Sequence, residues 1–208
     1  MFLKANNSFK KNYNGPEWWG PHYWYFLHWH ADLNVSHGDA RSRNEVAWLL
    51  RNVHSVLPCA SCAHEAYTYS SSHRVQFPHV VHNPELNVIY WRDMHNAVNR
   101  RLGKPIVVIA PVRRDYSFAT WWSHCSVVVT ACCEDFGSRS DSLDTCLTFI
   151  DIVLDSYRMM VDVNLSESVA VIEAKRNLFT NIRTNGRLRA MRKFCADIFD
   201  IVQHAASS

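Results

Sequence analysis

The segment 57–62, Leu-Pro-Cys-Ala-Ser-Cys, holds the residues of this chain best suited to redox chemistry. Two cysteines at this spacing can exchange disulfides, hold zinc or do neither. Pro58 suits a first helical position, so we predict that a helix begins at the cysteines. The positive end of a helix dipole favours a thiolate, which is the form that attacks a disulfide or an electrophilic cofactor. The flanking sequence has to decide between these functions.

A group of aromatic and polar residues precedes the cysteines. Trp19 and Gly20 are followed by Trp24 and His28. The last two are four residues apart, so their side chains share one face of a helix. Taken singly, Trp24 could belong to the core and His28 could be an ordinary helix histidine. Together with the cysteines, they suggest a site for a flat ligand.

A second group follows the cysteines and ends in Gly-Lys-Pro. His95 and Asn99 share a helix face, so both side chains could reach one edge of a ligand. Val98 and Leu102 would offer an apolar ledge for a flat ring. Lys104 lies just past the predicted helix end, where a cation is free to meet a phosphate. Asn96 completes the group, which could otherwise be a solvated helix face.

Two other classes of site compete for the same cysteines. Cys59, Cys62, His79 and His82 read as C-x2-C-x16-H-x2-H, which could be a structural zinc module. The histidine spacing is shorter than the usual three to five residues, which counts against zinc. A thioredoxin-type oxidoreductase needs a strand before its cysteines, but residues 46–57 have the apolar spacing of a helix.

Composition excludes several classes of protein. The chain has 208 residues, 48% hydrophobic and 20% charged, which predicts one or two globular domains with a core. Its net charge of +3 without a long run of like charges gives no nucleic-acid footprint, and we assign Arg100-Arg101 to a solvated face. No window approaches the roughly 18 apolar residues of a membrane helix, and the polar N-terminus lacks a signal-peptide core. We expect the protein to stay in the compartment where it is made.

Helical periodicity runs through the first half of the chain. We predict a first helix at about 21–35, a second helix that ends at Pro58, a third from the cysteines to about 71 and a fourth at 86–102. A connection interrupted by prolines is predicted at 77–84. Gly103 and Pro105 should end the last of these helices. The second helix has a predicted buried face of Val46, Leu49, Leu50, Val53 and Leu57.

The second half is also predicted to be helical, with a domain boundary near Ala110-Pro111. A helix at about 166–182 should face inwards through Val169, Ile172, Phe179 and Ile182. The fold class is therefore all-α, with a flexible tail at 1–15, a helical bundle at 16–110 and a helical accessory domain at 111–208. Two further apolar stripes are Leu143, Leu147, Ile150, Leu154, Tyr157 and Val161, and Leu188, Met191, Cys195, Ile198 and Val202.

In this order and spacing, the three groups resemble the Erv/ALR family of FAD-dependent sulfhydryl oxidases, in particular its viral members. The resemblance spans about residues 16–110, and its most specific part is the string His-Asn-x-Val-Asn-x-x-Leu-Gly-Lys-Pro at 95–105. It implies a bundle of four to five helices that holds FAD beside the Cys-x-x-Cys, and a homodimer. It also implies that electrons pass from dithiol proteins to oxygen, giving hydrogen peroxide.

The resemblance also implies roles for individual residues. Cys59 would exchange with the substrate and Cys62 would contact the flavin. Trp24 and His28 would pack on the adenine side, where Gly20 allows close approach, and Lys104 would meet the pyrophosphate. The residues that correspond to cofactor-binding positions are Trp19, Gly20, Trp24, His28, His95, Asn96, Val98, Asn99, Leu102 and Lys104.

The chain departs from the family pattern in three respects. Many members have a basic residue shortly before the Trp-Gly, where this chain has Pro16 and Glu17. The structural disulfide that brackets the His-Asn motif is absent, because Arg92 stands near its first position and 106–110 contain no cysteine. Any relay dithiol must come from the second half, as Cys125 or Cys146 paired with Cys132 or Cys133, and Cys195 should be buried.

The resemblance also bears on location. Family members that act in the cytoplasm are typically viral, and the missing targeting segment favours the cytoplasm of an infected cell, or a virion, over the mitochondrial intermembrane space.

Overall fold

The computed structural model describes residues 15–106, 117–138, 142–161 and 168–207. These residues are helical apart from short connections, and they contain no strand, which confirms the all-α prediction. The helices are α1 (Pro16–His37), α2 (Ala40–Asn52), α3 (Ala60–Ser72), α4 (Phe77–His82), α5 (Pro84–Arg101), α6 (Phe118–Ser138), α7 (Leu143–Val161), α8 (Val169–Asn185) and α9 (Arg187–Ser207), with 3-10 turns η1 (Val53–Val56) and η2 (Arg74–Gln76).

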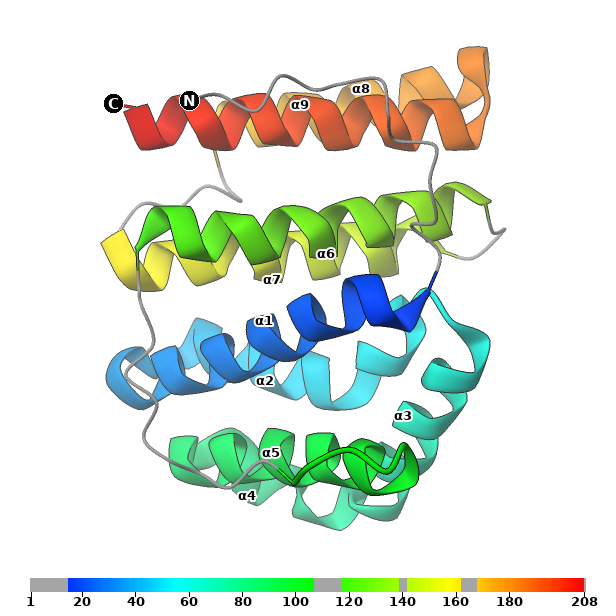
Figure 1. Cartoon of the computed structure of the whole chain (residues 1–208). Coiled ribbons are helices and arrows are strands. Elements are labelled where there is room, and N and C mark those ends of the chain that lie inside the picture. The colour runs from blue at the N-terminus through cyan, green and yellow to red at the C-terminus, as the bar shows by residue number, and fades with distance from the viewer. Residues whose placement is uncertain (1–14, 107–116, 139–141, 162–167, 208) are drawn as a thin grey trace.

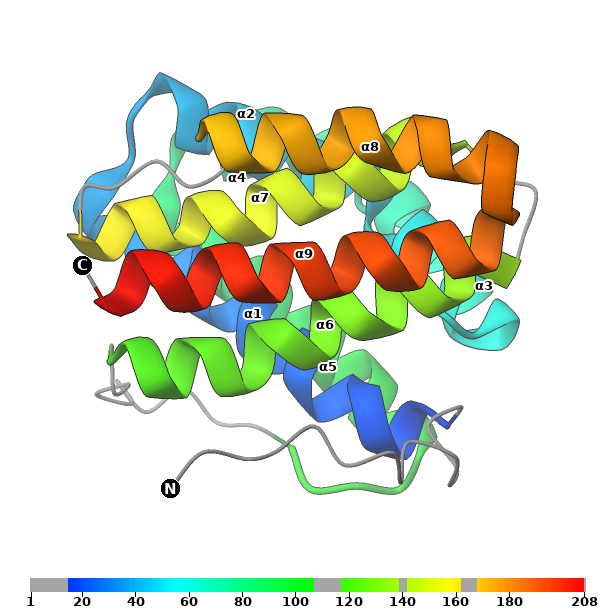
Figure 2. The same ribbon diagram turned by 90° about the horizontal axis from the view of Figure 1, so that it is seen from above.

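The helices stack in pairs (Figure 1). From one end of the molecule to the other, the pairs are α8 with α9, α6 with α7, α1 with α2, and α4 with α5, while α3 stands at one side. Seen from above, α9 lies over α6 (Figure 2). The second half of the chain meets the first where α6 and α7 pack on α1.

A single cluster of buried apolar side chains runs through both halves of the described chain. Tyr23 of α1, for example, stacks on Phe149 of α7, with ring centroids 5.7 Å apart. The predicted boundary near Ala110-Pro111 lies outside the described residues, as do residues 1–14 of the tail predicted at 1–15. The division into two domains stays a prediction.

Helix α1 begins five residues earlier than predicted, at Pro16 instead of Pro21. Pro16 occupies the first turn, where a missing backbone N–H costs nothing because it would have no helical partner. Pro21 removes only the hydrogen bond that would reach back to Glu17, near the end of the helix. The longer helix brings Trp19 and Gly20 into the same element as Trp24.

The region 77–84 was predicted to be a connection, but its first six residues form α4. Pro78 lies in the first turn of this helix, where proline is tolerated, and Phe77 and Val80 are buried. Helix α5 then starts at Pro84, capped by Asn83, whose side chain accepts from the backbone N–H groups of the next two non-proline residues.

The apolar stripes of α2, α7 and α9 are confirmed where the structure describes their side chains; the side chain of Val161 lies outside the described residues. The prediction for α8 is wrong at Ile172 and Phe179, which are 47% and 45% exposed, and right at Ile182, which packs half-buried on the core. The side chain of Val169 lies outside the described residues, and α8 instead buries Val171, Ala174 and Leu178. Both sets have helical spacing, so periodicity alone could not separate them. The small Ala174 lies on the buried side, where α8 packs on α9.

Asp39 caps α2 and joins it to the second half of the chain. Its carboxylate accepts from the backbone N–H of Ser42 at 2.7 Å and from Arg158 of α7 at 3.0 Å. The Ser42 backbone hydrogen bond is the main reason why the pKa of Asp39 is lowered to about 2.

Asp39→Ala is therefore expected to lower the free energy of unfolding by about 1 kcal/mol at pH 7, the usual value of such a cap. A lowered pKa means that the stabilisation is present above the unfolded-state pKa near 4 and is lost as the pH falls to about 2. Urea unfolding at pH 7 and pH 3 measures both effects. Asp39→Asn, which keeps the capping oxygen, should lose less, and an Ala variant as stable as the parent at pH 7 would contradict the assignment.

Candidate active site

A cavity of about 1070 Å³ opens between α1, α3 and α5. It lies at the upper end of the size range of small-molecule sites, so it has room for an extended ligand. The structure brings both cysteines and nearly all the predicted cofactor residues to its wall. Those that line it are Cys59, Cys62, Trp19, Gly20, Trp24, His28, His95, Val98, Asn99, Leu102 and Lys104.

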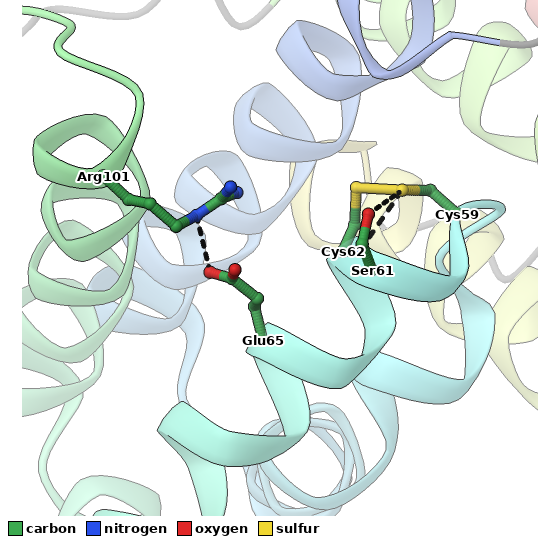
Figure 3. Close-up of a disulfide and its surroundings, with 5 residues drawn as sticks. All are labelled: Cys59, Ser61, Cys62, Glu65 and Arg101. Atoms are coloured by element: carbon green, nitrogen blue, oxygen red, sulfur yellow. Dashed lines mark hydrogen bonds and ion pairs between the residues drawn. A yellow bond between two sulfur atoms is a disulfide. The ribbon is translucent and has the colours of Figure 1, made fainter.

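The two cysteines form a disulfide at the N-terminus of α3 (Figure 3). Pro58 was expected at the first helical position, but it lies just before the helix, because Cys59 is the N-cap of α3. Cys59 Sγ accepts from the backbone N–H of Cys62 at 3.2 Å and from the Ser61 hydroxyl at 3.2 Å. Both donors would stabilise negative charge on Cys59 once the disulfide opens.

The segment before the disulfide is anchored on α1. The buried Tyr23 hydroxyl donates to the Val56 carbonyl at 2.9 Å, three residues before Cys59. Burial raises the pKa of Tyr23 well above its usual value, so the hydroxyl keeps its proton. Because Tyr23 also stacks on Phe149, the second half of the chain supports the position of the cysteine pair.

Trp24, His28 and His95 form an aromatic wall of the cavity. The rings of Trp24 and His95 stack with centroids 4.2 Å apart and planes 5° apart. His28 Nε2 and His95 Nδ1 are 3.1 Å apart, so one imidazole donates to the other. Burial, with the Lys104 charge nearby, lowers the pKa of His95 to about 4. The wall is therefore uncharged at His95 near neutral pH.

Lys104 reaches the cavity from a tight turn at the end of α5. Gly103 has a φ of 64°, which a side chain would disfavour. The Lys104 N–H donates to the Asn99 carbonyl at 2.8 Å, and the Asn99 side chain donates to the Pro105 carbonyl at 3.0 Å. Asn99 therefore holds the turn that carries Lys104, in addition to lining the cavity.

Arg101 is a second cation on the cavity wall, although the sequence had suggested a solvated face. Its Nε donates to Glu65 of α3 at 2.7 Å, so the pair links α5 to α3 one turn beyond Cys62 (Figure 3). The signal was present in the sequence, because Arg101 follows Val98 by three residues and shares its side of the helix.

Asn96 and His124 also differ from what the motifs suggested. Asn96 is buried and does not line the cavity, since it is rotated by about 100° from His95 along the helix. His124 of α6 lines the cavity and stacks on Tyr25 of α1, with ring centroids 3.6 Å apart. Burial lowers the pKa of His124. No local pattern could have predicted this residue, which comes from the second half of the chain.

The zinc alternative is wrong for the part of the chain that the structure describes. His79 and His82 lie exposed on α4, and the described segments contain no group of three or more His, Cys, Asp or Glu side chains that is placed to hold a metal ion. The thioredoxin alternative also fails, because α2 and η1 precede the cysteines where that fold has a strand. No helix of the described residues is long and apolar enough to cross a membrane.

Residues 21–121 match the sequence model of the Erv1 / Alr family. The FAD-linked sulfhydryl oxidase of African swine fever virus is 36% identical over 94 residues, which are 43% of this chain and 71% of that protein. Putative FAD-linked sulfhydryl oxidase 347L of Invertebrate iridescent virus 6 is 27% identical over 106 residues, 50% of this chain and 96% of that protein. Putative FAD-linked sulfhydryl oxidase 096R of Invertebrate iridescent virus 3 is 29% identical over 101 residues, 49% of this chain and 67% of that protein.

No solved structure showed significant similarity to the chain. The matched region runs from α1 to the first turn of α6 and contains the disulfide, the Trp24–His95 wall and the Lys104 turn. The similarity therefore falls on the helices that build the cavity. The chain belongs to the Erv1 / Alr family.

Proposed function

We propose that the chain is an FAD-linked sulfhydryl oxidase that forms disulfides in other proteins. The observation that carries this proposal is that the Cys59–Cys62 disulfide opens into the same cavity as the Trp24–His95 wall and the Lys104 turn. A disulfide that can be reduced, aromatic rings and cations on the wall of one cavity are what a thiol oxidase with a dinucleotide cofactor requires. The names of the viral relatives support the same activity.

The cavity fits FAD in the kind of groups that it presents. Trp24 and His28 would offer a surface for the adenine, and Lys104 and Arg101, which line the same cavity, would supply cations for the pyrophosphate. A Cβ added at Gly20 would meet no atom within 4 Å, so the backbone there is open to close approach. Bound beside Cys59–Cys62, the flavin would accept two electrons and pass them to oxygen, giving hydrogen peroxide.

The protein's own part in the reaction is thiol-disulfide exchange. A substrate thiolate attacks Cys59 Sγ, the Cys59–Cys62 bond breaks, and Cys62 leaves as a thiolate. The second substrate thiol then attacks the substrate sulfur of the mixed disulfide, and Cys59 leaves as a thiolate. The Cys62 N–H and the Ser61 hydroxyl stabilise that leaving group.

The balance of the reaction follows from these steps. The substrate loses two protons and two electrons as its disulfide forms, and the Cys59–Cys62 dithiol carries the electrons to the acceptor. Over one cycle, two thiols and one oxygen molecule give one disulfide and one hydrogen peroxide. Cys62 would be the thiolate that meets the flavin, and Cys59 would face the substrate.

The substrates are dithiol-containing proteins, and oxygen is the electron acceptor. Helices α6–α9 act as an accessory domain that supports α1 and supplies His124 to the cavity. The enzyme works as a homodimer in the cytoplasm of an infected cell or in a virion, which agrees with the viral origin of the relatives.

The purified protein is expected to be yellow, with the visible absorption spectrum of bound FAD at one equivalent per chain. An absorption spectrum, a metal assay and paired measurements of oxygen consumption and peroxide with a dithiol substrate check this prediction. Peroxide should equal the number of disulfides formed. A colourless protein that binds no added FAD would overturn the proposal.

A further inference from the structure

Four buried thiols gather between α6, α7 and α9, away from the cavity. Cys132 of α6 and Cys146 of α7 are both fully buried, and their Sγ atoms are only 3.2 Å apart. Cys133 and Cys195 complete the cluster, since hydrogen bonds with Cys146 and Cys195 are the main cause of the raised pKa of Cys133. The activity proposed above uses none of these four residues.

We propose that Cys132 and Cys146 form a second disulfide, which fixes α6 to α7 inside the core. Their sulfurs need to approach by about 1 Å to reach the 2.0 Å of a disulfide bond, which side-chain rotation can supply. Adjacent Cys132 and Cys133 would close a strained ring, so each needs a partner from another helix. The short contact assigns Cys146 to Cys132.

Because its sulfurs are buried, this bond differs from a relay dithiol. A relay has to meet substrate thiols, whereas the side chains of Cys132 and Cys146 are both 0% exposed. The other two candidates for a relay, Cys125 and Cys133, are 1% exposed. The bond is therefore structural, and it forms before the α6–α7 interface closes during folding.

The bond forms by two exchange steps. Cys132 thiolate attacks a protein disulfide, such as Cys59–Cys62 of another copy, and forms a mixed disulfide. Cys146 then attacks Cys132 Sγ, the disulfide forms, and the other copy keeps two electrons as its reduced dithiol. Only the identity of this oxidant rests on the proposed function; the bond itself does not.

The bond would also stabilise the support beneath the active site. Phe149, which stacks on Tyr23, follows Cys146 by three residues on α7. Tyr23 in turn holds the segment before Cys59. Loss of the bond should therefore lower the thermal stability of this support.

Counting free thiols tests the proposal. The chain has seven cysteines, so two disulfides leave three thiols that can be alkylated after unfolding without reductant, and one disulfide leaves five. Tryptic digestion should yield peptides 115–139 and 140–158 joined by a disulfide, and fragmentation between Cys132 and Cys133 identifies the linked residue. Five free thiols, or a bridge through any other pair, would overturn the proposal.

Single substitutions provide the second measurement. Cys146→Ala should leave four free thiols and lower Tm by roughly 5–10 °C beyond the control. Cys125→Ala, which removes a buried thiol from α6 that is not part of the proposed bond, is the matched control and should leave two free thiols. The Tm of Cys146→Ala and of Cys125→Ala should also be compared with and without reductant. If the difference between the two Tm values is the same under both conditions, this would count against a bond that stabilises the fold.

A variant without the active-site pair separates this proposal from the oxidase activity. Cys59→Ser/Cys62→Ser contains five cysteines, so the Cys132–Cys146 bond leaves three free thiols and its absence leaves five. Three free thiols in a variant without turnover support the structural bond with a different oxidant. If the parent has three and this variant has five, the enzyme itself forms the bond. Five in both proteins reject the bond and leave the oxidase activity untouched.

Discussion

Cys59→Ser is expected to abolish turnover of a dithiol while adding a broad long-wavelength band to the spectrum of the bound FAD. The remaining Cys62 cannot form a disulfide, so its sulfur persists as a thiolate and donates charge to the electron-poor ring beside it. Cys62→Ser should lose turnover equally, by more than about 100-fold, because one thiol alone cannot complete the exchange. Its spectrum should be that of a simple bound flavin.

The structure explains why serine is the suitable replacement at both positions. Cys59 is the N-cap of α3, and serine is a good N-cap residue, so Cys59→Ser keeps an acceptor for the Cys62 N–H. Alanine would remove that acceptor and cost about 1 kcal/mol of stability. Both serine variants should therefore retain the fold and the cofactor.

Ser61→Ala is the matched control for the spectra. It removes the hydroxyl that donates to Cys59 Sγ but leaves both cysteines in place, so no long-wavelength band should appear. Stopped-flow spectra of the three variants, with FAD content measured after unfolding, make the comparison. A band in Cys62→Ser instead of Cys59→Ser would exchange the two roles, and loss of FAD from both would refute the assignment.

The sequence predicted which side chains line the same cavity where those residues follow local spacing, while their roles at the cofactor stay a prediction. Trp24 and His28, and His95 and Asn99, are each four apart on one helix, so periodicity alone placed each pair on one face. The Gly103-Lys104-Pro105 ending likewise marked the end of α5 and the exposed position of the cation. These features depend on a few neighbouring residues, which the sequence displays directly.

The features that the sequence did not predict depend on contacts between distant segments. His124 reaches the cavity only because α6 packs on α1, about 100 residues further along the chain. In α8, two apolar stripes had equal periodicity, and packing on α9 selected the one with Ala174. The 3.2 Å contact between Cys132 and Cys146 similarly requires α6 and α7 to lie side by side.

Trp24→Ala is expected to weaken FAD binding by about 10- to 100-fold. The variant loses the ring that stacks on His95 and forms part of the aromatic wall. Burial and stacking of a ligand on such a surface contribute roughly 1.5–3 kcal/mol, which corresponds to that loss of affinity. Titration of the apoprotein with FAD, followed by quenching of flavin fluorescence, measures the effect without any turnover.

Trp122→Ala provides the matched control, because it removes a half-buried tryptophan that contacts Phe199 and does not line the cavity. A general loss of packing would affect both variants, whereas a direct contact with the cofactor affects only Trp24→Ala.

The pKa of His95 gives an independent readout of the same substitution. Burial is the main reason why this pKa is about 4, so removal of the Trp24 ring should raise it towards the usual value near 6.5, as NMR titration of the imidazole would show. Equal FAD affinities in the two variants, with an unchanged His95 pKa, would mean that Trp24 belongs to the core and not to the cofactor site.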